Sequence, residues 1–487
     1  MPLFPSLETL KTLAQDPTIR RVPVCGEMLA DELTPVEAVN LLREASEHVF
    51  LLESVEDKNH WGRYSFLGFR PSLCVTAQAG ELYVNGERQP ETDVHAYLRE
   101  LLRTHRSARI EGFPPLTGGL VGYFSFEYFG YTEASLDFQY RDPNDFKDLN
   151  LMLFERIIAF DHLKQKILLI VNVATEDLEA NYVRAQMAVE EMKALLKTSH
   201  RAPNPRGRLT GEMTPLFDQP SFCQMVERAK HYITEGDIFQ IVLSNRFSGP
   251  FEGSLFNTYR LLRTINPSPY LFYFSGTDVE VAGASPETLV KLTNGLLHTF
   301  PLAGTRPRGT TPEEDAALEA ELLADQKELA EHNMLVDLGR NDLGKISRFG
   351  TVKVEKLRAI ERFSHVMHIG STVRGEIRED KDALDAISAV LPAGTLSGAP
   401  KIRACELIHE LEDNQRGVYG GAVGYIDFAG NMDTCIAIRL AYRKGDRVYV
   451  RSGAGIVADS VPENEYQECV NKAKAVVRAL ERSGEDL

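Results

Sequence analysis

Four glutamates form two pairs with the same spacing. Glu328 and Glu331 are three residues apart, and so are Glu465 and Glu468. Residues three apart in a helix share a face, so each pair would present two carboxylates to one side. Carboxylates suit a hard divalent cation such as Mg²⁺, which completes its shell with water and ligand oxygens. Each pair alone is also typical of a solvated helix face, so a metal site requires the fold to bring both helices together.

Glycine-rich segments lie between these glutamates, at Gly304-Thr305, residues 394–401, Gly420-Gly421 and residues 453–455. Glycine lets backbone N–H groups approach an anion closely. The segment 397–400 leads into a predicted helix, whose N-terminus would favour a carboxylate or phosphate. Tight turns without a ligand are the alternative interpretation of each segment.

Three further side chains could carry charge or protons in a site. Arg439 and Arg451 lie in or beside predicted strands, where a buried cation is costly unless paired. Their partner could be a ligand carboxylate, held in a fork geometry, or an internal Asp or Glu. His368 lies in an apolar run, as core histidines do, but an imidazole that titrates near neutrality could also serve as a general acid or base.

Periodicity and punctuation predict the elements that must position these residues. Thr34-Pro35 reads as an N-cap followed by a first-turn proline, with Glu37 at the capping-box position. Helices are predicted at residues 34–45, 181–197, 221–235, 312–338, 383–390, 400–412 and 463–482. Strands are predicted at residues 74–77, 151–158, 167–173, 270–274, 352–356, 421–427, 435–442 and 447–452.

The order of these elements favours an α+β fold. Neither a regular βα alternation nor a GxGxxG motif is present, which disfavours a Rossmann sheet. We therefore expect large antiparallel β-sheets forming a two-lobed sandwich with helices outside. Residues 199–214, rich in Pro, Gly and Arg, are predicted to connect an amino-terminal part, 1–198, to a second part, 215–487.

Composition narrows the function classes. The chain has 487 residues, 54 of them basic and 70 acidic, for a formal charge of −16, and this balance argues against a nonspecific nucleic-acid binder. The densest apolar run, Ile167–Val171, is far shorter than the roughly 20 residues of a membrane helix. The start of the chain shows no secretory signal pattern. The six cysteines are scattered without a CxxC pair, which fits a reducing cytoplasm.

Five ordered motifs resemble the chorismate-utilising enzymes, most closely the branch that makes anthranilate. They are PLAGTRPRG at 301–309, EHNMLVDLGRNDL at 331–343, GTLSGAPK at 394–401, YGGAVGY at 419–425 and RSGAGI at 451–456. The similarity extends over nearly the whole chain, through an amino-terminal part to about Val173 and a chorismate-binding part from about Thr214 to Leu480.

The resemblance implies that ammonia adds to the chorismate ring with loss of the ring hydroxyl, and that pyruvate is then eliminated. Mg²⁺ would be the cofactor, bound by Glu331 and Glu468 with Glu328 and Glu465 in support. His368 would act in pyruvate elimination, and Thr305 would also be catalytic. The residues implied in chorismate binding are Gly304, Thr305, Tyr419, Arg439, Gly453, Ala454 and Gly455.

Two positions discriminate within the family. Relatives that add water carry a lysine base where this chain has Gln240, and an amide cannot deprotonate water. Aminodeoxychorismate synthases typically carry a lysine at the position of Ala303, where it can attack the ring, although some members of that group lack it. The resemblance therefore favours anthranilate formation, with aminodeoxychorismate synthesis or a noncatalytic tryptophan-sensing role as the alternatives.

The resemblance also implies regulation and a partner. Ser54, Pro269, Tyr270 and Leu271 would bind tryptophan as a feedback inhibitor, between the two parts of the chain. Leu271 replaces a methionine common in the family, with similar bulk. The chain has no recognisable glutaminase nucleophile, so use of glutamine would require a separate glutamine amidotransferase subunit that delivers ammonia. The assembly, a heterodimer or a dimer of heterodimers (a heterotetramer), is left open.

Overall fold

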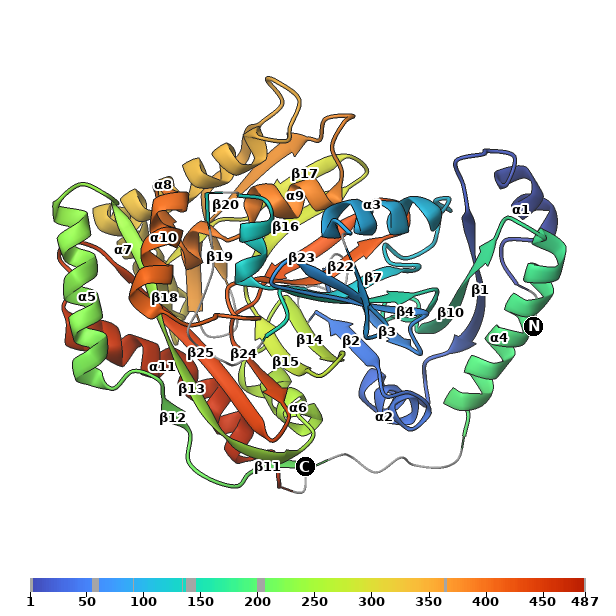
Figure 1. Ribbon diagram of the computed structural model, residues 1–487, viewed down its shortest axis with the longest axis horizontal. Coiled ribbons are helices and arrows are strands. Elements are labelled where there is room, and N and C mark those ends of the chain that lie inside the picture. Colours follow the sequence, from blue (N-terminus) through green and yellow to red (C-terminus); the bar gives the residue numbers. More distant parts are fainter. Residues whose placement is uncertain are drawn as a thin grey trace.

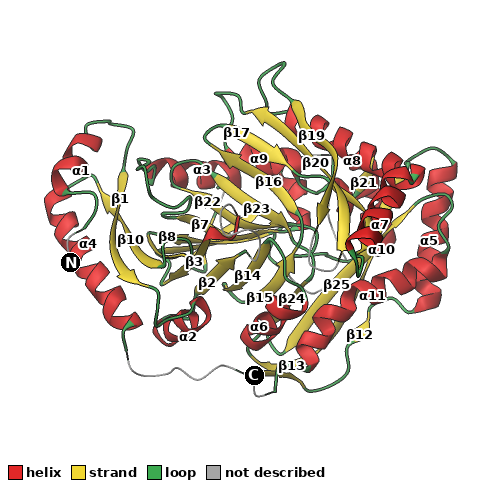
Figure 2. Cartoon of the chain, turned by 180° about the vertical axis from the view of Figure 1, so that it is seen from behind, coloured by secondary structure: helices red, strands yellow, loops and turns green. Residues whose placement is uncertain are grey.

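The computed structural model describes residues 3–54, 61–90, 92–133, 135–136, 146–198, 206–362 and 366–485. Two large antiparallel sheets lie between outer helices (Figures 1 and 2). This arrangement confirms the predicted α+β class with helices outside.

The first sheet has the order β1-β10-β9-β3-β2-β14-β15-β24-β25-β13-β11, with β12 and β21 also paired to β13. Its strands are β1 (Arg21–Leu29), β2 (Val49–Glu53), β3 (Tyr64–Phe69), β9 (Arg156–Asp161), β10 (Lys166–Ala174), β11 (Gly207–Leu209), β12 (Thr214–Pro215), β13 (Gln240–Gly253), β14 (Tyr270–Ser275), β15 (Glu280–Ser285), β21 (Gly398–Ala399), β24 (Leu440–Lys444) and β25 (Arg447–Ile456).

The second sheet has the order β18-β20-β17-β16-β23-β22-β7-β8-β4-β5-β6, with β19 paired to β20. Its strands are β4 (Leu73–Gln78), β5 (Glu81–Val84), β6 (Glu87–Gln89), β7 (Gly119–Phe124), β8 (Leu149–Phe154), β16 (Thr288–Thr293), β17 (Leu296–Thr299), β18 (Leu302–Pro307), β19 (Lys353–Arg362), β20 (Val366–Glu376), β22 (Ala422–Asp427) and β23 (Met432–Ile436).

The helices cover the outer faces. They are α1 (Leu7–Leu13), α2 (Pro35–Ala45), α3 (Val94–Thr104), α4 (Leu178–Leu196), α5 (Gln219–Thr234), α6 (Phe256–Ile265), α7 (Pro312–Ala324), α8 (Gln326–Gly344), α9 (Ala383–Val390), α10 (Lys401–Glu412) and α11 (Pro462–Glu481), with short 3-10 turns η1 (Trp61–Arg63), η2 (Phe126–Tyr131) and η3 (Gly394–Leu396). In Figure 1, α2 and α6 lie below the sheets and α3, α8 and α9 lie above them.

Both faces of the central strands are buried. On β14, Leu271 and Tyr273 pack into the core beneath α2 and α6, whereas Phe272 and Phe274 pack between the sheets. Because successive strand residues point to opposite faces, a strand covered on both sides is apolar throughout. This explains the continuous apolar run at Ile167–Val171.

Each sheet contains strands from both predicted parts of the chain. In the first sheet β2 pairs with β14, and in the second β7 pairs with β22. The boundaries at 198 and 215 stay a prediction, since residues 199–205 lie outside the described residues.

Three predicted elements are interrupted. The helix expected at 312–338 is broken at Asp325, whose side chain accepts hydrogen bonds from the backbone N–H groups of Lys327 and Glu328 and so caps α8. The strand expected at 151–158 is two strands, β8 and β9, in different sheets. The strand expected at 435–442 is likewise divided between β23 and β24. A continuous apolar pattern cannot reveal such a crossing, because both sheets bury their strands on both faces.

Candidate active site and effector pocket

A cavity of about 800 Å³ brings together most of the residues implicated by sequence. Its walls come from β13, β18, β20, β25, α8 and α11, with the 419–421 turn and η3 between them. The candidate residues that line it are Thr305, Glu331, His368, Tyr419, Arg439, Gly453, Gly455, Glu465 and Glu468. Chain segments as far apart as Thr305 and Glu468 thus face one space.

His368 is held as a neutral imidazole. It lies on β20 opposite Thr305 of β18, and its Nδ1 is 3.0 Å from the Gly304 carbonyl oxygen and 3.0 Å from Thr305 Oγ1. A carbonyl can only accept, so Nδ1 carries the proton and Nε2 is the basic nitrogen. Burial lowers the pKa of His368, and the positive charge of Arg439 lowers it further. The side chain is therefore suited to accept a proton near neutrality.

Glu287 is a functional candidate that sequence reasoning missed. It lies between β15 and β16, lines the cavity and accepts a hydrogen bond from Thr395 Oγ1 at 3.3 Å. Burial raises the pKa of Glu287 to about 7. A carboxyl group that is still substantially protonated near neutrality can serve as a general acid. Its signal in sequence, a glutamate after Ser285-Pro286 at a strand end, is too short to stand out.

Arg439 is a cation in the cavity wall. It lies between β23 and β24 in a left-handed conformation, with φ 53°, and not within a strand as predicted. Burial lowers its pKa, and in the described part of the chain no carboxylate is within ion-pair distance of its guanidinium. A buried, uncompensated guanidinium is costly, so a ligand carboxylate is the partner that this position favours.

Arg451, unlike Arg439, is paired with a carboxylate of the chain itself. Its side chain is fully buried and pairs with Glu412 at 3.2 Å, while also donating to Asn414. Glu412 is shared with Arg416, a second fully buried arginine that donates to the carbonyl oxygens of Leu396 and Val242. This network fixes the strands and turns behind the cavity wall.

Close packing excludes a side chain at Gly453 and leaves little room for one at Gly455. A Cβ at Gly453 would lie 2.9 Å from Tyr419 Oη, and one at Gly455 would lie 3.0 Å from Gln240 Nε2. Ala454 points the other way, into an apolar core. Gly304, with φ 67°, is outside the cavity lining but supplies the carbonyl that orients His368.

The glutamates approach one another from two helices. Glu331 of α8 and Glu465 and Glu468 of α11 face the same cavity. Burial raises the pKa of Glu331, and the negative charges of Glu328 and Glu468 raise it further. Burial, together with Glu468, likewise raises the pKa of Glu465. Such mutual repulsion fits a site that gains a divalent cation, and oxygen donors of this kind suit Mg²⁺.

The glutamate carboxylates do not form a complete set of metal ligands in the described structure. In the ranges that the structure describes, no three His, Cys, Asp or Glu side chains are close enough to hold a metal ion. Glu468 instead pairs with Lys472, whose Nζ lies 2.6 Å from its carboxylate and 3.0 Å from the Gly453 carbonyl oxygen. Glu328 lies outside the cavity lining, beside Gly304 and 3.9 Å from Arg306.

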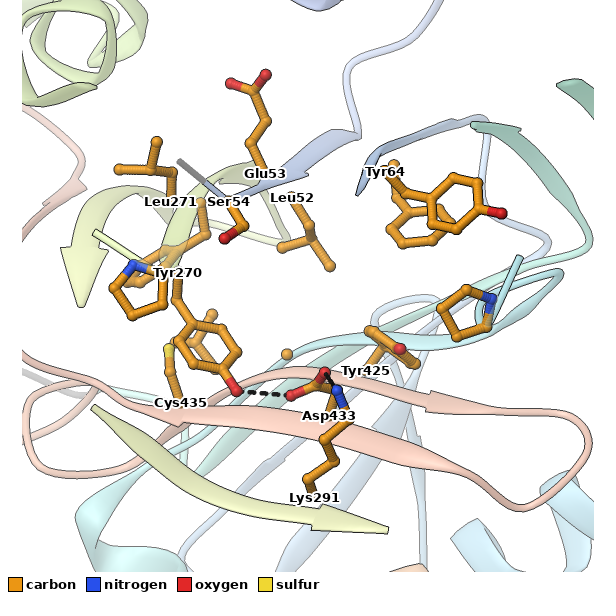
Figure 3. Close-up of a pocket in the computed structure, with 16 residues that line it drawn as sticks. Leu52, Glu53, Ser54, Tyr64, Tyr270, Leu271, Lys291, Tyr425, Asp433 and Cys435 are labelled. Atoms are coloured by element: carbon orange, nitrogen blue, oxygen red, sulfur yellow. Dashed lines mark hydrogen bonds and ion pairs between the residues drawn. The ribbon is translucent and has the colours of Figure 1, made fainter. Parts of the chain in front are cut away.

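A second pocket lies between the two sheets (Figure 3). Ser54, Pro269, Tyr270 and Leu271, the residues implied in tryptophan binding, all line it. The opposite wall comes from β16, β22 and β23 and carries an ion pair, with Lys291 Nζ 3.0 Å from Asp433. Tyr270 Oη donates to Asp433 Oδ1 at 2.8 Å. The pocket thus combines aromatic rings with charged groups of both signs, which suits an aromatic amino acid.

The cavity also contains the two discriminating positions. Gln240 at the start of β13 and Ala303 on β18 both line it. Neither an amide nor a methyl group can act as a base or attack a ring, so these walls leave the nucleophile to come from solution.

No helix among the described residues is long and apolar enough to cross a membrane.

Known proteins resemble the chain over nearly its whole length. Residues 48–478 match the family model described as chorismate binding enzyme. The chain is 44% identical to an anthranilate synthase component 1 of Acetivibrio thermocellus, over 99% of each chain, and 44% identical to that of Pseudomonas aeruginosa, over 94% of this chain and 95% of the relative.

Solved structures agree with these relatives. Anthranilate synthase component I from Streptococcus pneumoniae superposes with a TM-score of 0.76 at 38% identity, covering 93% of this chain and 99% of that one. The menaquinone-specific isochorismate synthase of Escherichia coli shares the fold, with a TM-score of 0.70 at 22% identity and coverage of 97% and 98%. The chain belongs to the chorismate-binding enzyme family.

Proposed function

We propose that the chain is the large subunit of an anthranilate synthase and converts chorismate and ammonia to anthranilate and pyruvate. The observation that carries the proposal is that one cavity combines three side chains: Arg439 without a carboxylate partner among the described residues, a neutral His368, and Glu287 with a raised pKa. These are a carboxylate anchor, a base and an acid. Relatives at 44% identity bear the same activity in their names.

The two stages of the reaction require the acid and the base in turn. Ammonia forms a C–N bond to the ring as the ring hydroxyl departs, and the proton from Glu287 lets it leave as water. Aromatisation then removes a ring proton, which Nε2 of His368 accepts, while the ring C–O bond to the enolpyruvyl group breaks and its electron pair stays with the oxygen. The departing enolate takes up a proton at its methylene carbon and becomes pyruvate. Arg439 holds a substrate carboxylate through both stages.

Glu331 and Glu468 would hold Mg²⁺, with Glu328 and Glu465 nearby. The bound cation would neutralise the ring carboxylate and withdraw electron density from the ring. Within the chain, this proposal requires Lys472 to release Glu468, since the two side chains are paired at 2.6 Å. Tyr419, Thr305 and the backbone at 453–455 would shape the remaining chorismate surface.

The experiment that tests the proposal supplies purified chain with chorismate, Mg²⁺ and ammonium. Fluorescent anthranilate together with an equal amount of pyruvate is the expected result. A product that keeps the pyruvyl group would instead indicate aminodeoxychorismate synthesis, which the methyl side chain of Ala303 disfavours. Absence of turnover, with ligand binding unaffected by Glu331→Gln or Glu468→Gln, would indicate a noncatalytic sensor.

The pocket between the sheets supports feedback inhibition by tryptophan. Ser54 follows β2, Pro269 precedes β14, and Tyr270 and Leu271 begin β14. Because β2 pairs with β14, the residues named from sequence share one wall of this pocket. Replacing Ser54 with phenylalanine would fill the space beside Tyr270. We expect Ser54→Phe to keep the ammonium-dependent activity and lose inhibition, and retained inhibition would refute the assignment.

Glutamine use would require a glutamine amidotransferase partner that hydrolyses glutamine and delivers ammonia. All six cysteines are free, and burial raises the pKa of the Cys25, Cys405, Cys435 and Cys469 thiols. Such thiols are poor nucleophiles, which supports dependence on a partner. Free cysteines also support a place in the reducing cytoplasm. Glutamine-dependent turnover by the purified chain alone would overturn the partner proposal.

A further inference from the structure

The 285–288 segment, which runs from the end of β15 to the start of β16, lines the substrate cavity and contacts residues that line the effector pocket. Pro286 and Glu287, at its centre, line the substrate cavity. The residues at its ends, Ser285 and Thr288, contact residues of the effector pocket instead. The segment is therefore in contact with both sites at once.

Thr288 is tied to Tyr270. The two hydroxyl oxygens are 3.0 Å apart, and the single proton of Tyr270 is directed to Asp433 at 2.8 Å (Figure 3). Thr288 must therefore donate to Tyr270 Oη. Thr288 is also the cross-strand partner of Cys435, which lines the effector pocket. A movement of the Tyr270 ring thus acts directly on the residue that follows Glu287.

Ser285 makes the second tie. It is fully buried and faces Tyr270 across the β14–β15 pair. Its hydroxyl donates to the Ile436 carbonyl oxygen at 2.7 Å and hydrogen-bonds the Cys435 thiol. The Ile436 N–H in turn donates to the Glu287 carbonyl oxygen at 2.9 Å.

The connector after Ile436 reaches the substrate anchor. Ile438 and Arg439 line the substrate cavity, and the Arg439 carbonyl oxygen accepts from the Ala284 N–H at 3.1 Å. The acid Glu287 and the cation Arg439 are thus both attached, by backbone hydrogen bonds, to elements that also form the effector pocket. Any ligand that changes the spacing between Tyr270 and Cys435 must strain these bonds.

We propose that the 285–288 segment couples the two sites, so that an aromatic amino acid in the effector pocket displaces the Glu287 carboxyl and the Arg439 guanidinium from their working positions. This inference rests on the proposed function. A ligand controls a remote site only through a difference in affinity between two states, and the hydroxyls of Ser285 and Thr288 are the groups whose hydrogen bonds differ between them.

The test separates tryptophan binding from tryptophan inhibition. Thr288→Val removes the hydroxyl while keeping the branched shape, and Thr288→Ser, which keeps the hydroxyl, is the matched control. Calorimetry measures the tryptophan Kd, and ammonium-dependent anthranilate formation measures the activity left at saturating tryptophan. We expect T288V to keep the wild-type Kd within about threefold and to raise the residual activity at least about fivefold, the lower end of typical coupling factors. T288S should match the wild type.

Two results would overturn the proposed coupling. In the first, tryptophan inhibits T288V as completely as it inhibits the wild type. In the second, T288V loses tryptophan binding and inhibition together, which would mean that Thr288 acts only as a part of the effector pocket. A wild-type enzyme that neither binds tryptophan nor is inhibited by it would overturn the proposed regulation as well, and the wild-type arm reveals this separately. If T288V does not fold, Ser285→Ala replaces it in the test. This variant removes the Ser285 hydroxyl and its hydrogen bonds, and we expect from it the same effects on Kd and on residual activity.

Discussion

Glu287→Gln tests whether this half-buried carboxyl supplies the proton for the departing hydroxyl. The amide is close in size and can still accept from Thr395, but it cannot donate an acidic proton. A positioned general acid contributes typically about 10²–10⁴-fold to rate, so we expect kcat to fall by at least about 10², or about 2.7 kcal/mol at 1.36 kcal/mol per factor of ten. The KM for chorismate should change little, because Arg439 remains.

The pH dependence gives a second, independent readout. The pKa of Glu287 is about 7, and the acid is active only while protonated, so kcat/KM should decline as pH rises through this value. Ammonia rises with pH, so the assay must hold free ammonia constant and not total ammonium. The hydrogen bond from Thr395 stabilises the carboxylate. Thr395→Val should therefore move the decline to higher pH, by up to about one unit if that bond is worth about 1.4 kcal/mol.

Glu287→Gln should lower activity but raise stability above neutral pH. A carboxyl whose folded-state pKa is raised contributes stability below its unfolded value, and that contribution is lost as pH rises toward about 7. Glu287→Gln should therefore unfold at higher urea concentrations than the wild type above pH 7, and tryptophan binding reports that the fold is intact. An E287Q enzyme with wild-type kcat, or with an unchanged alkaline decline, would refute the assignment of Glu287 as the acid.

Three further predictions follow from the charged groups. Arg439→Gln should raise the KM for chorismate by about 10-fold or more, because the neutral side chain loses a charge-assisted hydrogen bond worth about 1.5–3 kcal/mol; steady-state kinetics measures this, and an unchanged KM contradicts it. Glu412→Gln should lower the free energy of unfolding by about 3 kcal/mol in urea titrations, because it removes the buried negative charge that Arg416 and Arg451 share. A loss below about 1 kcal/mol would contradict this and would mean that hydrogen bonds alone stabilise the two buried arginines. Lys472→Gln should strengthen Mn²⁺ binding to the substrate-free enzyme several-fold, because Glu468 loses a competing cation; titration followed by electron paramagnetic resonance checks this, with Lys474→Gln as the control on the same helix.

Local patterns predicted the elements well where one interaction dominates. The helix that begins after Thr34 starts at Pro35, with the Thr34 hydroxyl accepting from the Glu37 N–H. The helix over 383–390 has the predicted bounds, and its N-cap Asp382 makes a full capping box. Caps and periodicity involve neighbours within one turn, so they can be read without knowing the fold.

The breaks within predicted elements depended on distant partners. Glu155 and the residues at 437–439 lie where the chain passes from one sheet to the other. Nothing local marks these crossings, because the strands on either side are equally apolar. The second crossing affects the site directly, because it leaves Arg439 between two strands, in a left-handed conformation at the cavity wall.

Sequence alone determined the chemistry available to this protein: the ordered glycine motifs, the two glutamate pairs, His368, and the absence of lysine at 240 and 303. Tertiary structure decided which of these charged groups are paired within the protein and which face the cavity. It paired Arg451 with Glu412 and left Arg439 for a ligand, and it buried Glu287 until its pKa approached 7. Residue type sets which charges a chain can carry, whereas burial and the nearest counter-charge set which of them face a substrate, and those follow only from contacts between segments distant in sequence.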